Sequence, residues 1–167
     1  MPNTVNGVPI HVLLVHAVVV LLPLAALLAI LGAVWPAARR RLGIVTPITA
    51  LASVLFIPLT TSAGEWLQEH VPDSELVRRH VQLGDGLLVW AGLLFVLTTA
   101  LWLTDTAPDR GWRLPAAAVS RATRVVGSVL LCAVAVVAVV QVYRIGDSGA
   151  KAAWDNRLVS SVPGSPD

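Results

Sequence analysis

Four long apolar segments constrain this chain more than any other feature. They predict membrane spans at about residues 10–34, 44–63, 86–104 and 119–143. The uncharged core of each is about 17–20 residues long, or roughly 26–30 Å of helix, which is enough to cross a bilayer core of about 30 Å. The alternation typical of outer-membrane barrels is missing. The sequence therefore predicts an all-α integral membrane four-helix bundle in a lipid bilayer.

Composition limits what else the chain can contain. Of the 167 residues, 56% are hydrophobic and 13% are charged, which is far from the composition of a soluble domain. We expect one membrane domain over residues 1–155 and a flexible tail over 156–167. The net charge is only +2 and the basic residues border apolar spans, so the composition does not favour a nucleic-acid partner. A single cysteine, Cys132, excludes an intrachain disulfide.

The basic residues predict the orientation. Seven arginines lie in the two connections between spans one and two and between spans three and four, at positions 39, 40, 41, 110, 113, 121 and 124. The first sixteen residues contain no lysine or arginine. The positive-inside rule then places both connections in the cytoplasm and both termini outside. We expect a multi-pass protein of the cell's inner (plasma) membrane, with an uncleaved first span.

With that orientation, polar residues gather at the outer ends of all four spans. They are His11, His16, Thr60, Thr61, Ser62, Glu65, His80, Asp85, Gln141, Arg144 and Asp147. His16 and Asp85 adjoin uninterrupted apolar runs, so they should lie at similar depth. His11 and His80 each lie five residues further out, about 7.5 Å along a helix. Ionisable groups near hydrocarbon depth are candidates for a functional site.

The spacing of the histidines suggests how such a site could be built. His11 and His16 differ by about 140° around a helix, so they do not share a face and cannot readily chelate one ion alone. We predict His16 and His80 as ligands of haem b or a transition metal, with His11 and Glu65 supporting them. The alternative is a polar network in which Asp85 pairs with Arg144 near Asp147. His70 lies in a connection and is assigned no site.

Two further local predictions concern structure. Ser74, between Asp73 and Glu75, is a typical helix N-cap with favourable charge in the first turn. The glycines of the spans should permit close helix contact. These are Gly32, Gly84, Gly86, Gly92 and Gly127.

Motifs of known enzymes are missing from the sequence. It contains no phosphate-binding glycine loop, cysteine pair, covalent haem motif or nucleophile elbow, which argues against an enzyme. We therefore favour an accessory subunit that joins other membrane-protein subunits in a larger assembly, such as a respiratory-chain complex. The alternative is a haem- or metal-binding electron-transfer protein. A proton or cation path is disfavoured, because no ionisable residue reaches the inner half of any span.

Four short motifs carry a resemblance to a known family. They are Asn6–His11 with Val15-His16-Ala17, Ser62-Ala63-Gly64-Glu65, Arg79-His80 with Leu83-Gly84-Asp85, and Ile145–Trp154. In this order they resemble domain-of-unknown-function family 2231, in its actinobacterial form, over about residues 1–155. The resemblance implies four membrane helices and a motif-bearing outer face, with a suspected association with haem or redox chemistry and no established activity. Two positions depart from the family pattern: Val12 replaces a frequent proline, and Asp147 replaces a frequent histidine, which alters any site that relies on a ligand there.

Overall fold

Helices make up almost all of the part of the chain that the structure describes. The computed structural model describes residues 4–5, 7–106, 111, 115 and 120–160, with side chains as far as residue 154. A small antiparallel pair, β1 (Thr4–Val5) and β2 (Val8–Pro9), precedes the helices. These are α1 (Ile10–Val34), α2 (Pro36–Leu42), α3 (Val45–Gln68), α4 (Glu75–Asp85), α5 (Leu87–Thr106) and α6 (Arg121–Ser160). The predicted all-α membrane fold is confirmed.

Four helical stretches are long and apolar enough to cross a membrane. The third runs through α4 and α5 together, because Gly86 between them keeps right-handed helical geometry. The continuous helix therefore begins at Glu75, before residue 86, where we predict the membrane span to start. Ser74 caps it as expected, accepting a hydrogen bond from the Val77 backbone N–H at 3.2 Å. The fourth stretch continues well past the predicted end at residue 143, and residues 161–167 of the predicted tail lie outside the described part of the chain.

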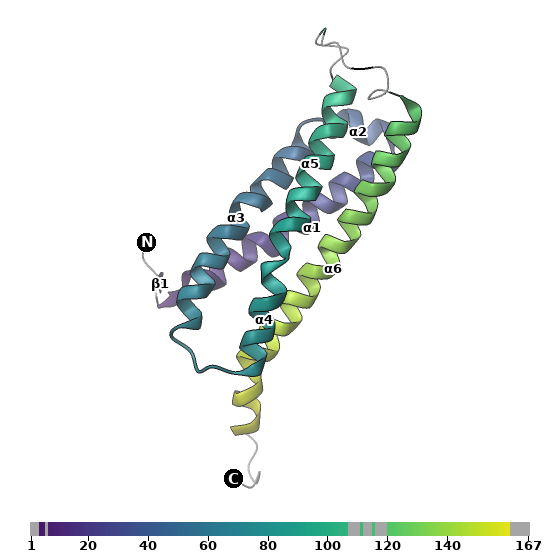
Figure 1. Cartoon of the computed structure of the whole chain (residues 1–167). Coiled ribbons are helices and arrows are strands. Elements are labelled where there is room, and N and C mark those ends of the chain that lie inside the picture. The colour runs from purple at the N-terminus through teal and green to yellow at the C-terminus, as the bar shows by residue number, and fades with distance from the viewer. Residues whose placement is uncertain (1–3, 6, 107–110, 112–114, 116–119, 161–167) are drawn as a thin grey trace.

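The long helices form a ring. α1 packs on α3 and α6, and α5 packs on the same two helices from the other side, so that α1 and α5 lie diagonally opposite (Figure 1). α4 packs mainly on α6. The start of α1, the end of α3 and α4 lie at one end of the bundle, while α2 lies at the other (Figure 1). We call these the histidine end, after His11 and His80, and the arginine end, after Arg39 and Arg124.

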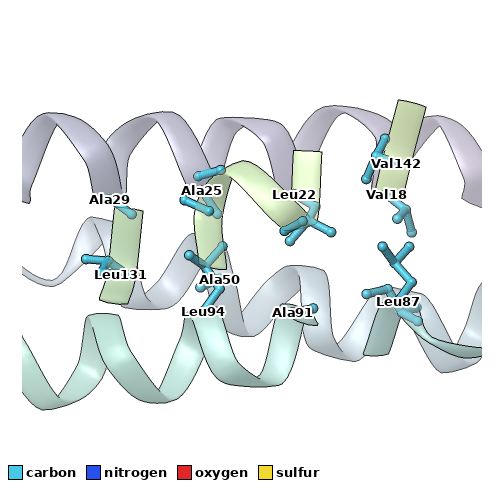
Figure 2. Packing of buried hydrophobic residues seen from close by; sticks show 14 residues of the cluster. Val18, Leu22, Ala25, Ala29, Ala50, Leu87, Ala91, Leu94, Leu131 and Val142 are labelled. Carbon is cyan, nitrogen blue, oxygen red and sulfur yellow. The ribbon is translucent and has the colours of Figure 1, made fainter. Parts of the chain in front are cut away.

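A narrow stripe of buried residues on each of the long helices α1, α3, α5 and α6 forms the core. On α1 the buried positions Val18, Leu22, Ala25 and Ala29 alternate in steps of four and three, which is the spacing of a seam between packed helices. Figure 2 shows Val18 of α1 and Leu87 of α5 pointing toward one another across this core. Close packing depends largely on alanine, at positions 25, 26, 29, 50, 91, 135 and 138.

The predicted role of the glycines is therefore mostly wrong. Gly84, Gly86 and Gly92 have open space where a side chain would begin, because they lie outside the buried stripe. Gly127 does approach a neighbouring helix, with a Cβ position 3.1 Å from Leu101.

Ion pairs join three elements at the arginine end. Asp105, near the end of α5, lies 2.9 Å from Nε of Arg39 in α2 and 3.4 Å from Nη2 of Arg124 in α6. The same Nη2 donates to the Thr104 carbonyl at 3.5 Å. The sequence suggests these arginines only as a signal of membrane orientation. In the structure, Arg39 and Arg124 also form ion pairs that connect the ends of α2, α5 and α6.

Candidate functional site

The histidine end brings together two imidazoles from opposite helices. His11 lies in the first turn of α1 and His80 in the middle of α4, and both are half-buried. Their ring centroids are 6.5 Å apart and the ring planes are nearly perpendicular, at 87°. The two rings therefore form an edge-to-face pair and are not stacked.

His11 is fixed by α3. Its Nδ1 lies 2.9 Å from the Thr60 carbonyl oxygen. One turn further along α3, Gly64 presents its bare backbone to the ring, so that a Cβ there would lie 3.0 Å from Cε1 and Nδ1 of His11. The imidazole can approach α3 this closely only because position 64 has no side chain.

His80 is fixed by α6 in a matching way. Its Nδ1 lies 3.1 Å from the Ile145 carbonyl oxygen and 3.1 Å from the Ser148 hydroxyl oxygen. The Ser148 hydroxyl in turn donates to the Ile145 carbonyl at 2.8 Å. A Cβ on Gly149 would lie 2.9 Å from Cε1 of His80, closer than side chains tolerate. Here too a glycine makes room for the ring.

These contacts decide which nitrogen of each ring is free. A backbone carbonyl only accepts hydrogen bonds, so Nδ1 of His11 and of His80 must carry a proton. In the neutral ring Nε2 is then left with its lone pair. Histidines that bind metals are typically held in this way, with the other ring nitrogen donating to a carbonyl or carboxylate. Nε2 is thus the nitrogen of each ring that is left to accept a hydrogen bond or bind a ligand.

The structure does not bring His16 to His80. The Nδ1 atom of His16 lies 2.6 Å from the Val12 carbonyl of its own helix, and the side chain is exposed. Residue 16 lies off the buried stripe that contains Val18, so its ring is directed away from the bundle core. His11, which we expected only to support the site, is the histidine that lies beside His80.

The predicted carboxylates lie outside the pair. Glu65 and Asp85 are exposed, and neither forms an ion pair with another described residue. Asp85 lines a cavity of about 200 Å³ between α3 and the α4–α5 helix, together with Thr61 and Ser62.

The predicted pairing of Asp85 with Arg144 is also not seen. Arg144 and Asp147 line a different, smaller cavity between α4 and α6, on another side of α4 from Asp85. Asp147 pairs instead with Lys151 one turn along α6, at 2.8 Å.

His70 forms only local contacts. Its Nδ1 lies 2.8 Å from the Trp66 carbonyl and its ring stacks on Trp66 with centroids 4.2 Å apart. Among the described residues, no group of three or more His, Cys, Asp and Glu side chains could hold a metal ion. A metal at the histidine end would therefore take only two ligands of these kinds.

The comparison with protein families places the chain. The model of a family described as predicted membrane protein, DUF2231, matches residues 7–161. The chain belongs to the DUF2231 family. No curated protein and no solved structure matches it. The family description gives a membrane location and no activity, so the function of this DUF2231 chain must be argued from the site itself.

Sequence reasoning missed the residues that hold the two rings. Gly64, Gly149 and Ser148 occur inside the motifs that carry the family resemblance, but nothing in those motifs shows that they face histidines. A usable signal was present in the spacing. His11, Val18 and Ala25 are seven residues apart, as are His80, Leu87 and Leu94, which places both histidines on the buried stripes of their helices.

Proposed function

We propose that this DUF2231 protein binds a metal centre between His11 and His80, each acting through Nε2. The facing arrangement of the two carbonyl-anchored imidazoles supports the proposal. With metal–nitrogen bonds of about 2.0–2.1 Å, imidazoles on opposite sides of one ion have ring centres roughly 6.4 Å apart. The observed distance of 6.5 Å between the ring centroids is close to that value.

The donor set favours haem b iron. A structural zinc site needs four protein ligands, and among the described residues only two imidazoles converge here. The porphyrin of haem provides four nitrogen ligands itself, so two histidines from the protein complete the iron. If haem were bound, His11 and His80 would hold its iron, and the group would supply electron transfer. The ligand type and the tautomer of the two histidines suit this group, although neither cavity described above is lined by His11 or His80.

A metal ion without a porphyrin could be held by the same two imidazoles. Copper(I) accepts a nearly linear pair of nitrogen ligands, and imidazole suits copper well. His11 and His80 would serve as ligands in either case, so the haem and copper versions differ in what fills the site and not in which residues form it.

Location and partners are part of the proposal. By the positive-inside rule, the histidine end would face the extracytoplasmic side of the plasma membrane, and the arginine end the cytoplasm. An electron-transfer centre there would exchange electrons with other membrane-protein subunits, which links it to the respiratory accessory role favoured from the sequence. An accessory role without any centre is the competing hypothesis.

The test is the composition of the natively purified protein. We expect about one haem or one copper ion per chain, measured by absorption spectroscopy and elemental analysis. Protein stripped of its metal should recover a stoichiometric centre with haemin in one arm or copper(I) in the other, and the arm that succeeds identifies the occupant. Native protein that is colourless and metal-free, and that takes up neither probe, would contradict the proposal and leave the accessory role.

A further inference from the structure

The two halves of the bundle place buried residues at matching positions. The sequence interval from His11 to His80 also separates the buried pairs Val18 and Leu87, Leu22 and Ala91, Ala25 and Leu94, and Ala29 and Thr98. A constant shift in residue number therefore relates the buried stripe of α1 to that of α5, and His11 to His80 of α4. The amino acids differ at most of these positions, so the match lies in burial and not in identity.

A second constant interval relates α3 to α6. It connects Ala50 with Ala135, Ser53 with Ala138, Ile57 with Val142, Thr60 with Ile145 and Gly64 with Gly149. The first three pairs are all buried. Thr60 and Ile145 provide the backbone carbonyls that accept hydrogen bonds from His11 and His80. Gly64 and Gly149 are the glycines that lie against the two rings.

The bundle is therefore two similar helical hairpins, α1 with α3 and α4–α5 with α6. α1 and α5 lie diagonally opposite, and Val18 points toward its counterpart Leu87 (Figure 2). Parallel repeats in membrane proteins are related by an axis along the membrane normal, with binding sites where the repeats meet. His11 and His80 face each other at such a meeting point.

We infer that Gly64 and Gly149 are the positioning residues of the histidine site, and that the site consists of two copies of one histidine–carbonyl–glycine unit. This inference deepens the proposed function and rests on it. In each unit the ring lies against a bare glycine and donates Nδ1–H to the carbonyl one turn earlier. A methyl group on either glycine would displace the ring that lies against it, which would disturb both that hydrogen bond and the position of Nε2.

The units differ at one position. Ser148, which adds a hydroxyl near Nδ1 of His80, corresponds to Ala63 in the other half. The hydroxyl is thus not common to both units, whereas the carbonyl and the glycine are. Ser148→Ala should accordingly leave the site formed.

The chain offers matched controls for the experiment. Gly146 in α6 and Gly92 in α5 have nothing within 4 Å of a built Cβ. We would purify the full-length Gly64→Ala, Gly149→Ala, Gly146→Ala, Gly92→Ala and Ser148→Ala variants. For each we would measure bound metal or haem per chain, the midpoint of thermal unfolding, and the ¹⁵N resonances of the imidazoles. Alanine is the better helix former, so the two control glycine variants should unfold at the same or a higher temperature.

We expect Gly64→Ala and Gly149→Ala each to lower the affinity for the metal centre at least tenfold and to shift the Nδ1 resonance of the histidine that faces the glycine. The three variants Gly146→Ala, Gly92→Ala and Ser148→Ala should keep the wild-type affinity and the wild-type resonances. If the wild type binds no centre, the proposed function fails, but the resonances and unfolding midpoints still test the positioning role. Gly64→Ala and Gly149→Ala variants that match the controls in every measurement would overturn the inference.

Discussion

The two ends of the bundle handle polar groups in opposite ways. At the arginine end, Asp105 neutralises Arg39 and Arg124 directly, and the ion pairs join α2, α5 and α6. At the histidine end, two rings donate to backbone carbonyls and keep a lone pair free on each. Asp105 finds cations beside it within the chain, whereas the proposed function would use the free lone pairs of the histidine end to bind a ligand. On that proposal the arginine end stabilises the bundle and the histidine end binds.

The largest expected effect concerns the membrane orientation of the two ends, because a reporter fusion lies on either one side of the membrane or the other. Reporter fusions at Gly43 should give a cytoplasmic signal, and fusions at Pro163 an extracytoplasmic one, since arginines concentrate at the arginine end. The control is a matched pair of reporters that are active on opposite sides of the membrane. A cytoplasmic signal at Pro163 would reverse the assignment of the histidine end.

The stabilising role of the arginine end is tested by Asp105→Asn. Two partly buried arginines would lose their counter-charge, and we expect about 2–4 kcal/mol of lost stability on unfolding. The affinity of the histidine end should stay unchanged, since Asp105 lies at the opposite end. Unfolding in mild detergent, followed by circular dichroism, measures the first quantity and metal content the second. Loss of the metal centre in a folded Asp105→Asn variant would break the division between the two ends.

We expect the smallest coupling between Asp85 and Arg144, an ion pair that the sequence suggests and the structure does not form. Asp85→Leu and Arg144→Leu should act independently, with effects on unfolding free energy that add within about 0.5 kcal/mol, because the two side chains line different cavities. A double-mutant cycle makes the measurement. A coupling energy above about 1 kcal/mol would show that the ends of α4 and α6 are joined by a charge pair after all.

Much of the fold follows from hydropathy, because the length of an uncharged segment is a direct consequence of bilayer thickness. The four spans were predicted in this way, whereas the cap at Ser74 was predicted from its residue type and the acidic residues beside it. The helix that contains the third span starts earlier than the predicted span, because α4 is polar on one side and has no long apolar run of its own. Hydropathy detects the part of a helix that lies in hydrocarbon and misses its polar extension.

The site was harder to predict, for a physical reason. A membrane helix is apolar on both its core and its lipid side, and α1 exposes large residues such as Val20 and Leu27. Hydrophobicity therefore does not show which face of α1 is buried, so depth alone suggested His16. Small residues mark the core better, because alanine lets helices approach. The seven-residue steps from His11 to Val18 and Ala25 then place His11 in the core and His16 outside it.

The contrast between His11 and His16 gives the most direct test of the account. The two histidines are on the same helix, five residues apart, and each has Nδ1 near a carbonyl, but only His11 faces His80. The measurement is the amount of haem or metal bound per chain in His11→Ala, His80→Ala and His16→Ala variants purified side by side with the wild type. The account predicts that the first two lose the centre and the third keeps it at the wild-type level. Loss of the centre in His16→Ala with retention in His11→Ala would contradict it.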